Sequence, residues 1–188
     1  MKKIIVTGAA GFIGYHLTKR LIDLDYYVLG VDNMNNYYDT NLKKDRLKKL
    51  GILNLSSKSE EFIKSENKNF VFINLDLNNI NELEDLTEVK DFDFFIHLAA
   101  QAGVRFSLNN PDQYFQSNIF GFYNILEFLK KNNLKNLIYA SSSSVYGDQN
   151  LYPFEESLRT DSQLNLYSAS KKINEILAQA YYNLNSIN

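Results

Sequence analysis

The chain has 188 residues, a formal net charge of −2, no cysteine and a hydrophobic content of 45%. A chain of this length can bury one sizeable core without staples, and the absence of cysteine excludes disulfide bonds and thiolate metal sites. Its acidic and basic side chains are interspersed rather than gathered into a basic face that binds a phosphate backbone, so we expect a small-molecule site and no nucleic-acid partner.

The chain opens on an apolar run that breaks at Thr7 and Gly8, and no signal-peptide cleavage pattern follows it. No apolar stretch reaches the roughly 18 residues that a membrane-spanning helix needs. We therefore expect no membrane partner and a cytoplasmic location.

Short apolar runs recur along the chain and are typical of buried parallel strands. They occupy residues 4–7, 27–31, 70–75, 94–98 and 137–140. Helical patterns occupy residues 14–24, 40–50, 113–131 and 166–183. This alternation predicts an α/β fold, a Rossmann-type doubly wound parallel sheet, as a single domain over 1–188. The polar stretch 56–69 predicts a mobile surface connection.

Three glycines follow the first predicted strand and open the first predicted helix. Gly8, Gly11 and Gly14 have the spacing G-x-x-G-x-x-G rather than G-x-G-x-x-G. Small residues at this position let the backbone approach a pyrophosphate at the helix N-terminus. The glycines alone can serve a tight turn, but their place between a strand and a helix favours dinucleotide binding.

Asp32 lies at the end of the second predicted strand, 18 residues after Gly14. A carboxylate there can accept hydrogen bonds from the adenosine ribose and repel a 2′-phosphate, which favours NAD over NADP. Lys43, Lys44 and Arg46 could in principle serve a phosphate. Their helical setting instead predicts a solvated face.

The third and fourth predicted strands also end in candidate ligand-binding residues. Asp76 and Leu77 follow the third strand, and the small segment Leu98–Ala100 follows the fourth. Open α/β sheets bind ligands at these carboxyl ends. His97 and the serines 141–144 do not indicate a hydrolase, because no G-x-S-x-G motif occurs; we expect His97 to be a packed or hydrogen-bonded strand histidine.

Tyr167 and Lys171 lie one turn apart on the last predicted helix, hence on the same face. The lysine cation can stabilise a phenolate and lower the tyrosine pKa, which makes Tyr167 a candidate acid/base near neutral pH. A Tyr-x-x-x-Lys pair also arises by chance on a helix surface. Its value comes from the glycine turn, Asp32 and Ser142 that precede it.

In this order, these motifs resemble the extended short-chain dehydrogenase/reductase family, in its branch of NAD-dependent nucleotide-sugar epimerases and dehydratases. The resemblance runs from end to end of the chain. Segments 6–14, 32–39, 97–105 and 141–147 are most similar to the UDP-glucuronate 4-epimerases. The strings 36–39 and 101–105 are the most specific of these.

The resemblance implies that Tyr167 is the catalytic base at the sugar 4-hydroxyl, that Lys171 binds the nicotinamide ribose, and that Ser142 hydrogen-bonds the reacting oxygen. NAD⁺ would take the C4 hydride and return it to the other face of the 4-keto sugar, with inversion at C4. The implied substrate-binding residues are Arg105, Ser142 and Ser143. The implied NAD-binding residues are Gly8, Gly11, Phe12, Ile13, Gly14, Asp32, Asn33, Asp76, Leu77, Leu98, Ala99, Ala100, Asn118, Tyr167 and Lys171. No metal ligand is implied.

The resemblance further implies partners and a pathway. UDP-glucuronate and UDP-galacturonate would be the substrate pair, used in polysaccharide synthesis, and two copies would pair through helices 113–131 and 166–183. The 4,6-dehydratases carry Thr-Asp-Glu where this chain has Ser142, Ser143 and Ser144, which disfavours that reaction. A decarboxylase of the same substrate shares the cofactor half and the Tyr/Lys pair, and stays an alternative.

Members of the family are much longer, so we expect this chain to lack the C-terminal lobe that holds the sugar nucleotide. Two hypotheses follow: an epimerase that is whole only with a second part, and a non-catalytic remnant that merely binds NAD or folds poorly. The strand 137–140 would then be an edge strand, open to association.

Overall fold

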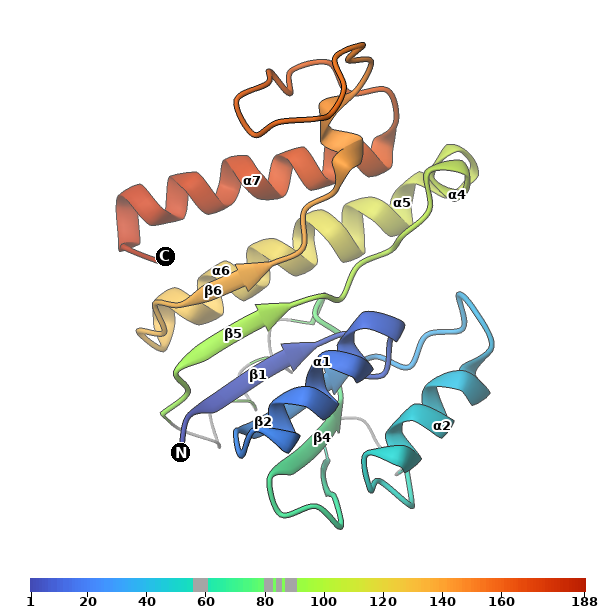
Figure 1. Ribbon diagram of the computed structural model, residues 1–188, viewed down its shortest axis with the longest axis vertical. Coiled ribbons are helices and arrows are strands. Elements are labelled where there is room, and N and C mark those ends of the chain that lie inside the picture. Colours follow the sequence, from blue (N-terminus) through green and yellow to red (C-terminus); the bar gives the residue numbers. More distant parts are fainter. Residues whose placement is uncertain (56–60, 80–82, 84–85, 87–90) are drawn as a thin grey trace.

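One sheet organises the part of the chain that the computed structural model describes, residues 1–55, 61–79, 83, 86 and 91–188 (Figure 1). Its six strands lie in the order β3-β4-β2-β1-β5-β6. They are β1 (Lys3–Thr7), β2 (Tyr27–Asp32), β3 (Phe62–Lys64), β4 (Phe70–Asn74), β5 (Phe94–His97) and β6 (Leu137–Tyr139). All neighbours pair in parallel except β3 and β4, so the predicted Rossmann-type sheet is confirmed with one antiparallel strand added at its edge.

Helices cover both faces of this sheet, because the strands are apolar on both sides. Ile4 and Val6 of β1 pack into one core cluster with residues of α1 (Phe12–Asp23) and α2 (Thr40–Lys49). Ile5 packs into a second cluster with α6 (Gly121–Lys131) and α7 (Leu166–Asn185). Figure 1 shows α1 in front of the sheet and α6 behind it. Continuous apolar strands buried on both faces are what parallel sheets require.

The order of the strands reverses at β1. The chain runs outward from β1 to β2 and β4, and then returns to β5 on the other side of β1. Thr7 at the end of β1 pairs with His97 at the end of β5. Loops leave these two strands in opposite directions, which opens a crevice at their carboxyl ends.

The prediction of a mobile connection over 56–69 was wrong in its second half; residues 56–60 lie outside the described residues. Phe62–Lys64 form β3, antiparallel to β4. Phe62 packs against one core cluster and Ile63 against the other. The Asn67 side chain accepts a hydrogen bond from Asn69 N (2.9 Å) in the turn between the two strands. Three residues are too few to display a strand period in the sequence.

The predicted single helix 113–131 consists of three pieces. They are α5 (Pro111–Tyr114), a π-helical segment (Phe115–Phe120) and α6. A π-turn adds a residue to the helical turn, which shifts the buried face. Tyr114 and Asn118 are therefore fully buried, whereas Phe115 is 43% exposed. A further short helix, α4 (Val104–Asn109), lies in a stretch where the sequence predicted none.

The strand β6 forms the edge of the sheet, as expected, and the last residues of the chain cover its beginning. Asn188 N donates to Lys135 O (2.6 Å), and Leu137 N donates to Asn188 O (2.8 Å). The side chain of Ile187 is buried in the core cluster beneath α6 and α7. Among the helices of the described ranges, none is both long enough and apolar enough to cross a membrane.

Candidate cofactor and active site

A cavity of about 300 Å³ lies at the carboxyl ends of the central strands, at the reversal point of the sheet. It has the size of a small-ligand site. The predicted cofactor residues that line it are Gly8, Gly11, Phe12, Ile13, Gly14, Asp32, Asn33, Asp76, Leu77, Leu98, Ala99 and Ala100. The fold thus brings residues from four separate stretches of sequence around one space.

The glycine turn is closely packed between β1 and α1. Gly8 has a φ of +71°, a conformation that favours glycine. A Cβ on Gly14 would overlap Gly8 O and lie 2.7 Å from the Gly8 carbonyl carbon. Gly11 caps α1 without a side chain, so the first N–H groups of the helix meet no capping oxygen there. A helix N-terminus whose N–H groups have no side-chain cap fits the pyrophosphate of a dinucleotide.

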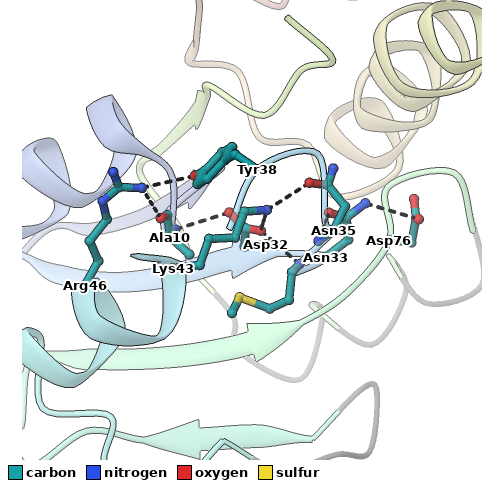
Figure 2. Close-up of polar contacts among 9 residues, drawn as sticks. Ala10, Asp32, Asn33, Asn35, Tyr38, Lys43, Arg46 and Asp76 are labelled. Atoms are coloured by element: carbon teal, nitrogen blue, oxygen red, sulfur yellow. Dashed lines mark hydrogen bonds and ion pairs between the residues drawn. The ribbon is translucent and has the colours of Figure 1, made fainter. Parts of the chain in front are cut away.

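Asp32 lies on the rim of the cavity and holds the turn in place (Figure 2). Its Oδ2 accepts from Ala10 N (3.2 Å), and its Oδ1 accepts from Met34 N (2.9 Å) and Lys43 Nζ (3.0 Å). The carboxylate is 6% exposed in this network. It ends β2 and lines the cavity next to the glycine turn.

The prediction that Lys43 and Arg46 form a solvated face was wrong. Lys43 is 4% exposed, lines the cavity and forms an ion pair with Asp32. The Arg46 guanidinium donates to Ala10 O (3.2 Å) and Tyr38 Oη (3.0 Å). Only Lys44 is exposed, as predicted for all three residues. The sequence did contain a signal that Lys43 is buried: it lies one turn before Leu47, a buried apolar residue, on the same face of the helix.

The far wall of the cavity comes from the ends of β4 and β5. Asn33 Nδ2 donates to Asp76 Oδ2 (3.3 Å), which links the loops after β2 and β4. Small side chains at Ala99 and Ala100 keep the space open. The predicted cofactor residue Asn118 lies behind this wall: its side chain exchanges hydrogen bonds with Gln101 N (2.7 Å) and O (3.0 Å). Its Nδ2 also donates to Ser170 Oγ (3.0 Å), which ties the wall to α7.

His97 is a buried strand histidine, as expected. Its Nδ1 lies 2.7 Å from Thr7 Oγ1, not against the serines 141–144, and its side chain packs on Phe122. Burial, with the nearby Lys171 charge adding to it, lowers the pKa of His97 to about 3. The imidazole is therefore neutral at physiological pH and joins β1 to β5 under the cavity.

The predicted catalytic residues stand beside this cavity rather than in its lining. Tyr167 lies in the first turn of α7, and its ring meets Tyr114 edge-on at 6.2 Å. Lys171, one turn later, is 3% exposed and donates from Nζ to Ala140 O (2.9 Å) beyond β6. Ser142 caps the 3₁₀ turn 143–146 by accepting from Ser144 N (3.2 Å).

The two remaining predicted residues are exposed on elements that contact α7. Arg105 lies on α4 and Ser143 begins the 3₁₀ turn. Both elements pack against α7. The predicted substrate-binding residues thus belong to elements that contact the helix that carries Tyr167 and Lys171.

Burial lowers the pKa of Lys171 to about 8, from 10.5. Below about pH 8 both the folded and unfolded chain carry the proton, and folding buries a charge at a cost of about 3 kcal/mol. Between pH 8 and 10.5 only the unfolded chain binds the proton, so this cost disappears as pH rises. We therefore expect Lys171→Met to stabilise the chain at pH 7, by up to about 3 kcal/mol, and by much less at pH 10.

Urea unfolding of both proteins at the two pH values measures this difference. Lys172→Met is the control, because Lys172 is only partly buried and pairs with Glu175 (3.1 Å). It should give no stabilisation at pH 7. A Lys171→Met protein that is less stable than the wild type at pH 7 would contradict the expectation.

Comparison with known proteins identifies the family to which the chain belongs. The sequence profile of the NAD dependent epimerase/dehydratase family matches residues 4–188. Protein CapI of Staphylococcus aureus is 46% identical over 182 residues, 97% of this chain and 50% of that protein. UDP-glucuronate 4-epimerase 2 of Arabidopsis thaliana is 44% identical over 179 residues, 95% of this chain and 38% of that protein.

The solved structures agree. UDP-glucuronic acid 4-epimerase from Bacillus cereus, in complex with UDP-glucuronic acid and NAD, superimposes with a TM-score of 0.81 at 34% identity, over 98% of this chain and 54% of that one. The chain thus spans about half the length of the relatives it matches. Because the family profile covers nearly the whole chain, and the glycine turn and sheet reversal stand where a dinucleotide site requires them, the chain belongs to the NAD dependent epimerase/dehydratase family.

Proposed function

We propose that this chain is the cofactor-binding and proton-transferring part of an NAD-dependent epimerase that inverts C4 of UDP-glucuronate. One observation carries the proposal: the Gly8–Gly14 turn, Asp32 and the Leu98–Ala100 segment surround a single cavity. The helix with Tyr167 and Lys171 is linked to its wall, because the Tyr167 ring contacts Tyr114, which donates to O of the lining residue Ala102. Relatives named UDP-glucuronate 4-epimerase, at 39% to 44% identity, support the choice of sugar. The reaction would supply a nucleotide sugar for polysaccharide synthesis in the cytoplasm.

Bound NAD would supply a reversible oxidant at C4 of the sugar. The chain's own residues would then move one proton: Tyr167 accepts it from the 4-hydroxyl and later returns it. Lys171, one turn later on the same face of α7, would bind the nicotinamide ribose. Ser142 would hold the same sugar oxygen by a hydrogen bond, which fixes the reacting group against the tyrosine.

The substrate side of the proposal rests on Arg105 and Ser143. Both are exposed, and both belong to elements that pack against α7, the helix that carries Tyr167. The Arg105 guanidinium would attract the anionic sugar nucleotide, and the Ser143 hydroxyl would bind it by a hydrogen bond.

Proton NMR of UDP-glucuronate, incubated with the folded 188-residue chain and NAD⁺, tests this function. We expect the anomeric signal of UDP-galacturonate to appear. A pentose signal with loss of carbon dioxide would instead identify the decarboxylase alternative. A folded sample that binds NAD and leaves the substrate unchanged would contradict epimerisation by this chain.

We further propose that two copies pair through α6 and α7. Both helices leave large apolar side chains in solvent, among them Tyr123 (43% exposed), Ile176 (59%) and Tyr182 (51%). Pairing would remove this area from water. Light scattering should give about twice the 21.8 kDa of one chain, and Ile176→Glu should return the mass to that of the monomer. A wild-type chain that stays monomeric at high concentration would contradict the pairing.

A further inference from the structure

The lining of the cavity contains a buried ion pair whose two members have opposite preferences for a phosphate. Asp32 and Lys43 are 6% and 4% exposed, and Lys43 Nζ lies 3.0 Å from Asp32 Oδ1. Lys43 also donates to Asn35 Oδ1 (3.1 Å). Figure 2 shows the lysine reaching from α2 across to the carboxylate. Both residues line the cavity, so a ligand that touches one lies close to the other.

A second cation stands directly behind this pair. Arg46, one turn after Lys43 on α2, donates to Ala10 O, while Ala10 N donates to Asp32 Oδ2. The guanidinium lies 5.7 Å from the Tyr38 ring, and Tyr38 lines the cavity. Lys43 thus contacts the carboxylate directly, whereas Arg46, on the same face of α2, is linked to it only through the backbone of Ala10.

We propose that Lys43 is a determinant of cofactor specificity, and that its ammonium group is a latent 2′-phosphate site that Asp32 holds closed. This inference rests on the proposed function, because it assumes that Asp32 accepts the ribose hydroxyls of a bound dinucleotide. A hydroxyl oxygen that donates to Asp32 lies about 3 Å from the carboxylate. A phosphate on that oxygen would be within reach of Lys43, because Lys43 Nζ forms a hydrogen-bonded ion pair with the same carboxylate.

The two members of the pair then act in opposite directions on a 2′-phosphate. Asp32 repels the phosphate, and it accepts the hydroxyl of NAD instead. Lys43 attracts the phosphate and cancels part of that repulsion. The selectivity of the chain for NAD over NADP is therefore smaller than Asp32 alone would produce, and each residue sets part of it.

Opposite substitutions should move this selectivity in opposite directions. Lys43→Met keeps the length of the side chain and removes the attraction, so we expect NADP to bind at least tenfold more weakly relative to NAD. Asp32→Asn removes the repulsion and leaves Lys43 and Arg46 in place, so we expect the preference for NADP relative to NAD to rise at least 100-fold. In the double variant Asp32→Asn/Lys43→Met, most of that gain should be lost.

Isothermal titration of the full chain with NAD⁺ and with NADP⁺, at one salt concentration, measures the ratio of the two dissociation constants. Lys44→Met is the matched control, because Lys44 is the next residue on α2, carries the same charge and is exposed. It should change the ratio by less than about twofold, as expected for a screened surface charge. Circular dichroism of each variant shows that it is folded.

The ratio separates a specificity role from a structural one. If Lys43 only stabilises the fold, Lys43→Met weakens NAD and NADP equally, and the proposal is wrong. The proposal is also wrong if a folded Asp32→Asn variant binds NADP no better than the wild type does. Should Asp32→Asn fail to fold, the ratio in Lys43→Met decides alone. If the wild type binds NAD and Lys43→Met leaves the ratio of dissociation constants unchanged, only this inference is wrong. If the wild type binds neither dinucleotide, the proposed function is wrong as well.

Discussion

Tyr167→Phe is expected to lower the rate of C4 epimerisation by about 10²- to 10⁴-fold, the range that a general acid/base contributes. The substitution removes the phenolic oxygen and keeps the ring. Tyr167 stands in the first turn of α7, whose start is fixed by the reciprocal side-chain hydrogen bonds of Asn165 and Ser168. Because neither that capping box nor the ring contact with Tyr114 needs the hydroxyl, the variant should fold like the wild type.

The measurement is the initial rate of UDP-galacturonate formation, followed by NMR beside thermal unfolding and NAD titration. Tyr182→Phe is a matched control, since it removes a phenol from the same helix at a position that is 51% exposed. It should retain full activity. A Tyr167→Phe protein with more than a tenth of the wild-type rate would remove Tyr167 from the role of base.

Gly14→Ala is expected to destabilise the chain by about 1–3 kcal/mol, the usual cost of an added methyl group in a packed site, and to abolish NAD binding. Two effects compete at this position. Alanine in a helix is favoured over glycine by about 0.5–1 kcal/mol. The new Cβ, however, would overlap Gly8 O and lie 3.0 Å from Ala9 Cα, and these are backbone atoms that cannot rotate away. The turn must therefore move, and with it the N–H groups that face the cavity.

Urea unfolding and NAD titration of the variant test this expectation. Gly121→Ala offers the matched control, because Gly121 also lies at the start of a helix, α6, and the nearest atoms to its added Cβ are 3.5 Å away. We expect that substitution to be neutral or stabilising. Equal stability and NAD affinity in Gly14→Ala and the wild type would show that the turn does not hold the pyrophosphate.

Much of the dinucleotide site could be predicted from the sequence because its signals are local. The Gly8–Gly14 turn, Asp32 and the Leu98–Ala100 segment each lie at the carboxyl end of a buried apolar strand. In a parallel sheet the carboxyl ends of the strands lie at the same edge, so these segments come together there. Parallel strands buried on both faces give continuous apolar runs, so each of these strands was found within a residue or so of its observed ends. Asn118 shows the limit of this reasoning: the side chain lies behind the cavity wall, where its hydrogen bonds fix Gln101.

Contacts between distant elements could not be predicted in this way. Phe62–Lys64 become a strand only because β4 offers them an edge, and three residues carry no detectable period of their own. The π-helical segment shifts the buried face of the helix, so that Asn118 is buried and Phe115 is exposed. A regular helical period does not predict this shift. In both places tertiary packing overrides the local pattern.

The sequence by itself therefore determined the fold class, the place of the dinucleotide turn and the order of the candidate catalytic residues, because each depends on periodicity or on residues close together in the chain. Only the tertiary structure decided which charged side chains are buried and which groups they pair with. Lys43 has the sequence environment of a surface lysine, and it becomes a buried partner of Asp32 because α2 packs against the glycine turn. Lys171 acquires its lowered pKa in the same manner, from burial against Ala140 beyond β6. Burial and pairing are properties of the packed chain, since the cost of a charge depends on which distant residues exclude water from it.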